Sequence, residues 1–456
     1  MNDTRDNGLN TSMELAARNI VARLHAAGFQ ALFAGGCVRD KLRGVPPKDF
    51  DIATDARPEQ VQALFKRTVA VGAHFGVVVV LEGGWQFEVA TFRADGAYLD
   101  GRRPESVRFT TAREDAERRD FTVNGLFYDP LREETLDYVG GRADLEKKIL
   151  RAIGEPAARF AEDKLRLLRA VRFAAALEFE IEAKTWEAVR AMAAQITSVS
   201  AERIRDELVK IFTAPTRLRG FDLLDASGLL RVVLPELDAC KGCAQPPQFH
   251  PEGDVFVHTR LMLSLLPTVQ TVSVPLVFSV LLHDIGKPPT FAVDPTGRIR
   301  FNGHEHVGAR MTERVLERLR FSRAEIDATV VAVEQHMAFK DVPHMRVATL
   351  KRMLARPTIE DEMELHRVDC AGSHGMLDNY EFLRAKQEEF ANAPLIPKPF
   401  INGRDLIALG LRPGPVFSEI LDAAQTRQLE GAFADRDAAL AWLCAAYGAD
   451  SEKKRG

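Results

Sequence analysis

The hydrophobic pattern of this chain changes at about residue 144, and this change constrains the fold more than any other feature. Between residues 30 and 140, short β-rich runs alternate with helical stretches, which is typical of an α/β or α+β unit. From there to the C-terminus the apolar residues follow a helical period. The 456 residues exceed what one compact core accommodates, so we expect two to four domains. The predicted fold class is therefore α+β, a mixed sheet with helices followed by helical domains.

The composition is that of an ordinary globular protein, with 46% hydrophobic and 28% charged residues. No apolar run approaches the ~18–20 residues that span a bilayer, and the polar N-terminus lacks an apolar signal core. We therefore expect a cytoplasmic protein with no membrane partner. The net charge of −4 weighs mildly against nucleic-acid binding, but phosphate contacts depend on local rather than net charge.

Two aspartates flank a phenylalanine in the stretch "KDFDIAT", which has the pattern of a strand. Alternate residues of a strand project from the same face, so Asp49 and Asp51 point one way while Phe50 and Ile52 point towards the core. Two adjacent carboxylates repel each other unless a cation lies between them. Mg²⁺, which prefers carboxylate oxygens, is the natural choice, whereas the alternative is a solvated strand edge.

Features on both sides of these aspartates favour the metal site. Gly35 and Gly36 allow the backbone to approach a bulky anion, and Arg39 adds a positive charge. In "WQFEVATFR", Glu88 would bring a third carboxylate on a neighbouring strand. These residues suit a site that holds a metal together with a phosphate group.

A second polar group lies in "ERRDFTVNGLFYD". Its spacing predicts that Arg118, Arg119, Asp120 and Asn124 line one side of a helix, with Asp120 and Asn124 as neighbours four residues apart. Arginines suit a triphosphate, and an Asp/Asn pair suits ribose hydroxyls or backbone positioning. Together with the carboxylates, this indicates metal-dependent phosphoryl or nucleotidyl transfer. A Walker-A sequence is absent, which excludes a P-loop enzyme.

A third group of polar residues lies at 162–173, where the sequence predicts a helix. Polar side chains recur there every three residues and would form a ridge along the helix: Asp163, Arg166, Arg169 and Arg172. Cytosine and adenine each present an amine donor beside a ring-nitrogen acceptor. A carboxylate beside a guanidinium complements that pattern and opposes guanine and uracil. Asp163 and Arg166 are therefore candidates for reading the base without a nucleic-acid template. The alternative is a surface helix with an ordinary ion pair.

In this order, GGxVRD at 35–40, DxD at 49–51 and RRDFTxN at 118–124 resemble the class II tRNA nucleotidyltransferase and bacterial poly(A) polymerase family, and the later EDxxR at 162–166 resembles the base-reading motif of its CCA-adding members. The resemblance implies a polymerase-β-like nucleotidyltransferase head, Mg²⁺ on the two aspartates of DxD, and base selection by the EDxxR pair. The residues expected to bind the nucleotide are Gly36, Arg39, Arg118, Arg119, Asp120, Asn124, Asp163, Arg166, Arg169 and Arg172. The expected catalytic residues are Asp49, Asp51 and Glu88.

Within this family, full CCA addition to tRNA from CTP and ATP is the leading hypothesis. The polar segment 93–109 resembles the flexible loop with which such enzymes switch from C to A, although an ordinary hairpin is the alternative. The segment 71–80 also resembles the CCA type. Poly(A) synthesis and addition of A alone are the runners-up. A hypothesis of another class is an RNA-binding module with an inactive head, attached to a metal-dependent phosphohydrolase.

A second candidate metal site begins with the adjacent His283 and Asp284 in "LLHDIGKP", at the end of an apolar helix. This pair, with distant histidine and aspartate partners, resembles the HD-domain phosphohydrolases. Imidazole and carboxylate ligands suit a divalent transition metal of unspecified identity. The expected ligands are His258, His283, Asp284 and Asp369, and His304 and His336 would make the site binuclear. Hydrolysis of cyclic phosphates or phosphomonoesters and a purely structural role are both open.

These assignments divide the chain into four expected parts. They are a nucleotidyltransferase head at 20–145, a helical neck and body at 146–240, an HD domain at 250–375 and a helical tail at 376–450 that binds tRNA. The sequence predicts no oligomeric state.

Overall fold

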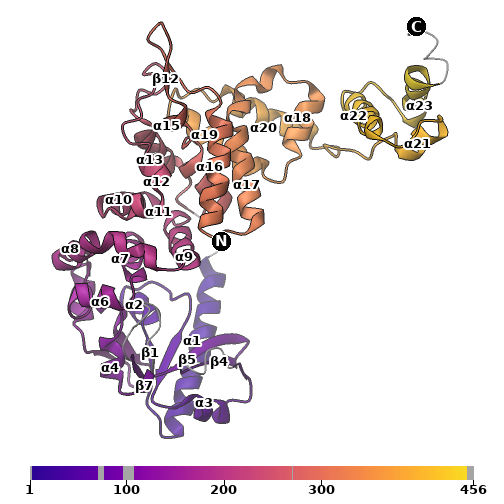
Figure 1. The fold of residues 1–456 in the computed structure, drawn as a ribbon. Helices are drawn as coiled ribbons and strands as arrows, with labels where there is room; N and C mark the ends of the chain where they lie inside the picture. Colours follow the sequence, from indigo (N-terminus) through magenta and orange to yellow (C-terminus); the bar gives the residue numbers. More distant parts are fainter. Residues whose placement is uncertain (1–2, 70–75, 96–106, 270, 449–456) are drawn as a thin grey trace. The chain divides into compact units, whose positions relative to one another are not determined.

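The computed structural model describes residues 3–69, 76–95, 107–269 and 271–448. Contacts divide the chain into two compact units, which we describe separately (Figure 1). The first unit comprises Met1–Asp238, Thr268–Thr271 and Arg318–Phe321. The second comprises Ala239–Pro267, Val272–Glu317 and Ser322–Gly456.

The first unit contains a seven-stranded sheet in the order β3-β4-β5-β2-β1-β8-β9. Its strands are β1 (Ala31–Ala34), β2 (Asp51–Thr54), β3 (Thr68–Val69), β4 (Val77–Glu82), β5 (Trp85–Thr91), β8 (Leu126–Asp129) and β9 (Glu134–Asp137). The pairing of β2 with β5 is parallel, and the other pairs of this sheet are antiparallel. The sheet therefore brings strands that are distant in sequence into direct contact, β2 with β5 and β1 with β8.

The central strands β1, β2 and β8 contribute alternate residues to two apolar layers. On one face Phe33, Ile52 and Val89 pack with residues of α1 (Asp3–Ala26) and α3 (Pro58–Leu64), as Figure 1 shows for α1. On the other face a smaller cluster includes Ala53 and Phe127, packed with residues of α4 (Ala112–Glu117). This second layer covers only part of its face, which leaves the start of β2 open.

The rest of the first unit is mostly helical. Near the sheet lie α2 (Gly36–Leu42), α5 (Gly141–Glu146), the 3-10 helix η2 (Thr122–Asn124) and the paired strands β6 (Arg93–Asp95) and β7 (Val107–Phe109). Beyond them follow α6 (Pro156–Glu162), α7 (Leu165–Leu177), α8 (Ala183–Met192), η3 (Ala193–Ser198), α9 (Ala201–Phe212), α10 (Arg217–Ala226), α11 (Leu229–Val233) and α12 (Pro235–Asp238), with short strands β10 (Ile149–Leu150) and β11 (Glu180–Ile181). Residues 96–106 of the predicted switching loop and 71–75 of the segment 71–80 lie outside the described residues.

The second unit is a helical assembly around the apolar helix α14 (Val274–Leu282), which packs against α13, α17 and α19. Its elements are α13 (Val255–Leu265), α15 (Lys287–Thr290), α16 (His304–Arg318), α17 (Arg323–Gln335), η4 (His336–His344), α18 (Val347–Leu354), α19 (Ile359–Ala371), α20 (Asp378–Phe390) and the strands β12 (Ala292–Val293) and β13 (Ile299–Arg300). At Gly286, a Cβ atom would lie 2.1 Å from the carbonyl oxygen of His304. Only glycine allows the turn after α14 to approach α16 so closely.

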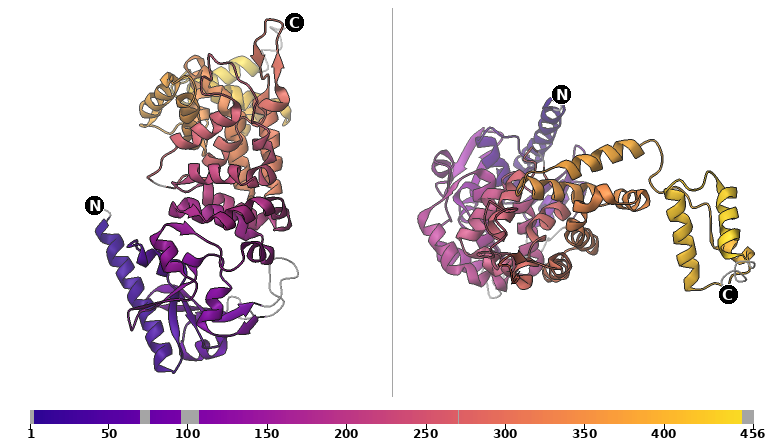
Figure 2. Two further views of the ribbon diagram at one scale, coloured as in Figure 1. Left: turned by 90° about the vertical axis from the view of Figure 1, so that its left-hand side faces the viewer. Right: turned by 90° about the horizontal axis from the view of Figure 1, so that it is seen from above.

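The C-terminal helices α21 (Gly403–Ala408), α22 (Pro415–Leu429) and α23 (Arg436–Tyr447) form an apolar cluster of their own (Figures 1 and 2). Leu406, Ile420 and Leu443 are at its centre. Among the described residues, no helix is both long and apolar enough to cross a bilayer.

The predicted α+β fold class is confirmed, with a mixed sheet in the head and helices after it. The prediction of a helix carrying Arg118, Arg119, Asp120 and Asn124 is wrong, because α4 ends at Glu117. The division into four parts stays a prediction.

Candidate functional site

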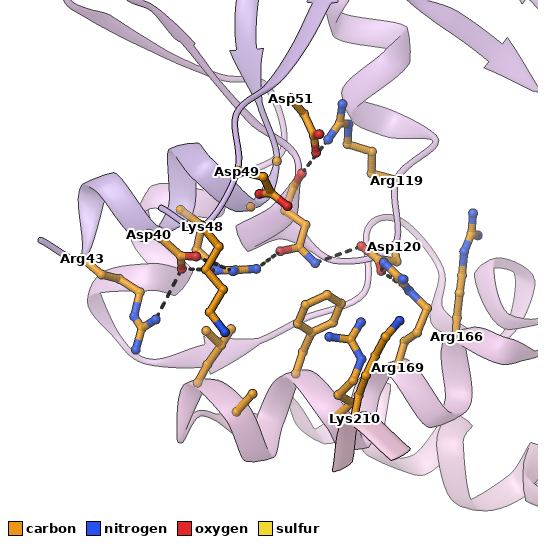
Figure 3. A pocket seen from close by; sticks show the side chains of 18 of the residues that line it. Asp40, Arg43, Lys48, Asp49, Asp51, Arg119, Asp120, Arg166, Arg169 and Lys210 are labelled. Carbon is orange, nitrogen blue, oxygen red and sulfur yellow. Dashed lines mark hydrogen bonds and ion pairs between the residues drawn. The ribbon is translucent and has the colours of Figure 1, made fainter. Parts of the chain in front are cut away.

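The first unit holds a cavity of about 980 Å³ between the open start of β2 and the helices α7 and α9. In Figure 3, Asp49 and Asp51 reach it from one side, and Arg169 and Lys210 from the opposite side. The cavity brings together every nucleotide-binding residue predicted from the sequence. These lining residues are Gly36, Arg39, Arg118, Arg119, Asp120, Asn124, Asp163, Arg166, Arg169 and Arg172.

The predicted carboxylate cluster forms at this open start of β2. Phe50 and Ile52 are buried in the core, whereas Asp49 and Asp51 are open to the cavity, which confirms the predicted alternation. Ile52 pairs with Val89 of the parallel strand β5, so the preceding residues, Asp51 and Glu88, are neighbours on the same face. Glu88 lies on a neighbouring strand, as predicted.

The three carboxylates repel one another. The pKa of Asp51 is raised to about 6, first by its partial burial in the concave cavity and then by the negative charges of Asp49 and Glu88, while Arg119 opposes this rise. The side chain of Asp51 is exposed because it opens into the cavity. Protein atoms of the cavity wall still surround its carboxylate and reduce its contact with bulk water. A site in which ionised carboxylates disfavour each other is a site that a divalent cation stabilises.

The double glycine makes a tight turn between β1 and α2. Gly35 has a φ of 72°, a conformation that favours glycine, and a Cβ atom there would lie 2.8 Å from Nη1 of Arg119. Helix α2 begins at the next residue, and from it the buried Arg39 donates through Nη1 to Oδ1 of Asn124 at 2.7 Å. The glycine therefore allows Arg119 and the start of α2 to share one corner of the cavity.

Arg118 and Arg119 lie in the turn after α4 and not on a helix. The buried Asp115 holds both, with distances of 2.7 Å to Nη2 of Arg118 and 3.1 Å to Nη2 of Arg119. Phe121 adopts an extended conformation and bridges to Ala152, which ends the helix in favour of η2. Asp115 was missed by the sequence analysis, although its spacing of three and four residues from the two arginines is a usable signal.

Asp120 links the head to α7. Its carboxylate accepts from Nδ2 of Asn124 at 3.1 Å, as predicted for this pair, and from Nε of Arg169 at 2.8 Å. Burial opposes ionisation of Asp120, but the charge and hydrogen bond of Arg169 outweigh burial and lower the pKa to about 2. Asp120 is therefore a permanent anion that fixes Arg169 at the cavity wall.

The predicted base-reading residues are held by separate partners. Asp163 lies before the first turn of α7, which begins at Leu165, so its predicted place on the helix is wrong. Its two oxygens accept from Nη1 and Nη2 of Arg203 at 3.2 and 2.7 Å. Arg166 donates to Oε2 of Glu162 at 2.6 Å and is mostly buried. Asp163 has an extended backbone between α6 and α7, and its Oδ1 accepts from the backbone N–H of Leu165 at 3.1 Å.

Further cations line the cavity beyond those predicted, among them Arg43, Lys48 and Lys210, all labelled in Figure 3. Arg172 pairs through Nε with the buried Glu207 of α9, which holds its guanidinium beside the cavity. The lysines were missed because single exposed lysines carry no distinctive pattern in a sequence.

The second unit gathers the predicted HD residues. His258, His283, Asp284, His304 and His336 are buried, and their ligand atoms form two overlapping groups that share Asp284. Asp369 joins them through its Oδ1, which lies 3.0 Å from Nε2 of His258. The six predicted ligands thus form one cluster.

The donor atoms of this cluster suit a metal. Nε2 of His304 and Nε2 of His336 lie 3.2 Å apart, and Oδ1 of Asp284 lies 3.5 and 3.9 Å from these two nitrogens. Nε2 of His283 and Oδ2 of Asp284 lie 3.0 Å apart, whereas Oδ1 of Asp284 is buried without a hydrogen bond to any described residue. Burying unpaired ligand atoms of this kind destabilises the fold unless a cation binds them.

Three neighbours of the cluster were missed. Lys287 Nζ lies 2.6 Å from Oδ2 of Asp284, and Glu252 Oε1 lies 2.7 Å from Nδ1 of His258. Nδ1 of His250 lies 2.9 Å from the same Glu252 oxygen. Lys287 follows Asp284 by three residues, a spacing that places two side chains close together on a helix and could have indicated the contact. Glu252 and His250 lie in a loop whose sequence has no periodic pattern, so the sequence did not indicate their contacts.

The raised pKa of Asp51 predicts a stability effect in metal-free protein. The folded-state pKa of about 6 exceeds the ordinary value, so the ionised Asp51 destabilises the fold as pH rises through about 6. We expect Asp51→Asn to increase the free energy of unfolding at about pH 8 by on the order of 1 kcal/mol, after allowance for solvent screening. Urea unfolding in a chelator measures this value.

The gain from Asp51→Asn should disappear below about pH 4, where both states of the wild type bind the proton. The exposed Asp341→Asn serves as the control and should leave the free energy of unfolding unchanged at either pH. A destabilised Asp51→Asn protein at about pH 8 would contradict the electrostatic explanation.

Comparisons with known proteins agree with the fold and the motifs. Three family models match the chain: a poly A polymerase head domain over residues 31–151, a probable RNA and SrmB-binding site of polymerase A over 178–241, and an HD domain over 260–370. The CCA-adding enzyme of Streptococcus mutans is 46% identical over 209 residues, 46% of this chain and 52% of the relative. That of Streptococcus thermophilus is 44% identical over 209 residues, with the same shares. The chain thus spans about half the length of the curated relatives it matches.

Solved structures match over nearly the whole chain. A Bacillus stearothermophilus CCA-adding enzyme in complex with CTP has a TM-score of 0.74 at 27% identity, and the match covers 97% of this chain and 99% of that one. A Thermotoga maritima CCA-adding enzyme complexed with tRNA shares the fold, with a TM-score of 0.58, 19% identity and 94% of each chain covered. The chain thus matches a poly A polymerase head domain, a polymerase A RNA-binding region and an HD domain, and in fold and motifs it is similar to CCA-adding enzymes.

Proposed function

We propose that this protein adds C, C and A to the 3′ end of tRNA from CTP and ATP, without a nucleic-acid template. The observation that carries this proposal is the single cavity where the carboxylates at β2, the arginines after α4 and the residues of α7 converge. The CCA-adding relatives support it, as does the neighbouring structure described as a complex with CTP. The helical tail, residues 376–450, would contribute to holding the tRNA.

The carboxylates of Asp49, Asp51 and Glu88 fit Mg²⁺, because they repel one another and form no ion pair with any described residue. Asp49 and Asp51 would hold the metal and Glu88 would assist. When bound, Mg²⁺ activates the terminal 3′-hydroxyl and neutralises the leaving pyrophosphate. In the reaction the 3′-oxygen forms a bond to the α-phosphorus, and the bond to the pyrophosphate oxygen breaks.

The protein's own residues orient the nucleotide. The turn at Gly35 and Gly36 lets the backbone approach the triphosphate, and the guanidinium groups of Arg39, Arg119 and Arg172 face it. Carboxylates behind these arginines hold them in place before the nucleotide arrives, as Asp115 does for Arg119. Little side-chain entropy is then lost on binding.

Base choice is assigned to Asp163 and Arg166. A carboxylate has about four acceptor sites, so Asp163 accepts from Arg203 and still has capacity for the exocyclic amine of cytosine or adenine. Arg166, held by Glu162, would donate to the ring nitrogen. Guanine and uracil present the opposite pattern and leave a charged group unsatisfied, which costs several kcal/mol.

The test of the main function is incorporation of each NTP, alone and combined, into tRNA that lacks CCA. We expect CTP alone to give two additions and CTP with ATP to give three, and Asp49→Asn to reduce the rate by at least about a hundredfold because one metal ligand is lost. Long A tails on generic RNA would identify a poly(A) polymerase. A single A, added only to tRNA ending in CC, would identify an A-adding enzyme.

An inactive head is the alternative from another class, an RNA-binding module attached to a phosphohydrolase. Unchanged incorporation in Asp49→Asn would refute the assigned catalytic site. Absence of any incorporation by the wild type, with retained tRNA binding, would favour the binding module.

The base-reading assignment has a separate test. Asp163→Ala should raise incorporation of UTP and GTP relative to CTP and ATP by about tenfold or more, because the group that rejects their carbonyls is gone. Ratios of kcat/KM for the four nucleotides measure this. Asp206→Ala, which removes an exposed carboxylate of α9, is the matched control. Unchanged ratios in the Asp163 variant would refute the role.

A second candidate activity, hydrolysis of phosphate esters, is supported by the six convergent HD residues and by Oδ1 of Asp284, which is buried without a hydrogen bond to any described residue. A cavity of about 640 Å³ opens beside them, lined also by Arg298, Arg300 and Lys340, which suit an anionic substrate. The ligands fit a divalent transition metal, which when bound supplies an activated water.

The hydrolase test uses a 2′,3′-cyclic nucleotide and a phosphomonoester, with protein loaded in turn with Mn²⁺, Co²⁺, Ni²⁺ and Zn²⁺. Asp284→Asn should lose at least about a hundredfold in rate, because Asp284 belongs to both ligand groups. The exposed Glu388→Gln is the control. No hydrolysis by the wild type with any of these metals would leave the HD domain a structural role.

A further inference from the structure

Among the described residues that line the head cavity, Phe173 of α7 is the one aromatic side chain. Three guanidinium groups lie over its ring. Their Cζ atoms are 3.9, 5.1 and 5.6 Å from the ring centroid, for Arg172, Arg169 and Arg39 in that order. Arg169 and Arg172 belong to α7, whereas Arg39 belongs to α2, and all three line the cavity. The ring therefore joins cationic groups of two helices at one wall.

Phe121 holds this ring from the side of the core. It has no exposed surface, and its ring centroid lies 5.8 Å from that of Phe173, at an interplanar angle of 75°. Such an edge contact is favourable for two aromatic rings. The extended backbone of Phe121, which replaces the predicted helix, thus gives Phe173 a fixed support.

Carboxylates hold the same three guanidinium groups along one edge. Each group donates its Nε–H to a carboxylate, which is Asp40 for Arg39, Asp120 for Arg169 and Glu207 for Arg172. A guanidinium has more N–H donors than its contacts with described residues use here, so donors remain on its Nη atoms. The carboxylate fixes one edge, and the ring limits rotation of the guanidinium plane about that edge.

The three like charges repel one another, and the carboxylates and the face of the ring both offset this repulsion. A triphosphate offsets it further, because its oxygens accept from guanidinium groups. We propose that Phe173 is a positioning residue that holds Arg39, Arg169 and Arg172 as one cluster for the triphosphate of CTP and ATP. This inference rests on the nucleotidyl transfer proposed for the head cavity and concerns what orients its arginines.

Stacking on the base is the other role that an aromatic ring has in a nucleotide site. The guanidinium of Arg172 lies over this ring at 3.9 Å, which is the separation of direct contact. Arg166, which is assigned to the base, is held by Glu162. A ring face covered by a guanidinium group serves phosphate binding and is closed to a base.

The test is steady-state incorporation of CTP into tRNA lacking CCA and of ATP into tRNA ending in CC, with excess Mg²⁺ and with inorganic tripolyphosphate as the inhibitor. Phe173→Leu keeps an apolar side chain but removes the ring face. We expect the KM for CTP and for ATP to rise alike, by about tenfold, with kcat little changed. The inhibition constant of tripolyphosphate should rise by a similar factor, because this probe has phosphate groups and no base.

Phe173→Tyr keeps the ring face and should retain KM values near those of the wild type. Phe29→Leu is the matched control, because it also removes a partly buried ring of the first unit, one that packs in the apolar cluster with α1. Thermal unfolding shows whether each variant folds, and Phe173→Met replaces Phe173→Leu if the latter does not.

Wild-type KM values in Phe173→Leu would overturn the inference. So would an equal loss in Phe173→Tyr, since the ring face would then not be the cause. Weakened CTP binding with unchanged inhibition by tripolyphosphate would place the ring against the base and would overturn it too. No incorporation of either nucleotide by the wild type would instead refute the proposed function of the head.

Discussion

Charge balance around the head cavity is the constraint on which the rest of this site depends. Most ionised carboxylates near the cavity have an arginine partner from another turn or helix, as Asp120 has Arg169 and Asp163 has Arg203. The carboxylates at the start of β2 are different, because Asp49 and Asp51 have no such partner among the described residues. These unpaired carboxylates would bind a cation, and the basic residues around them would bind an anionic substrate. The cavity therefore suits a metal ion and an anionic substrate bound together.

The same principle organises the second unit with different chemistry. There the donors are imidazoles and one deeply buried carboxylate, Asp284, and their partners are mostly one another. Lys287 supplies the nearest fixed positive charge, and Glu252 the nearest outer carboxylate. The carboxylate oxygens in the head suit Mg²⁺, whereas the imidazole-rich site in the second unit suits a transition metal. The type of ligand would therefore make each site select a different metal.

Much of the head site could be predicted from sequence because its residues lie in short motifs. Alternation at Phe50 and Ile52 indicated which way the aspartates point, since a strand has a period of two. The local conformation after α4 could not be predicted in the same way. The spacing of Arg118 and Asp120 fits a helix, but the burial of Phe121 in an extended conformation outweighed that preference.

The sequence alone determined the chemical groups of both sites, because the motifs specify residue types and local spacing. Tertiary structure decided the partners. The parallel pairing of β2 with β5 brings Glu88 beside Asp51, and the packing of α9 on α7 gives Asp163 its arginine. A loop without any pattern brings Glu252 to His258. Such contacts join residues far apart in the chain, and their pairing follows from how whole elements bury their apolar faces, which local spacing does not encode.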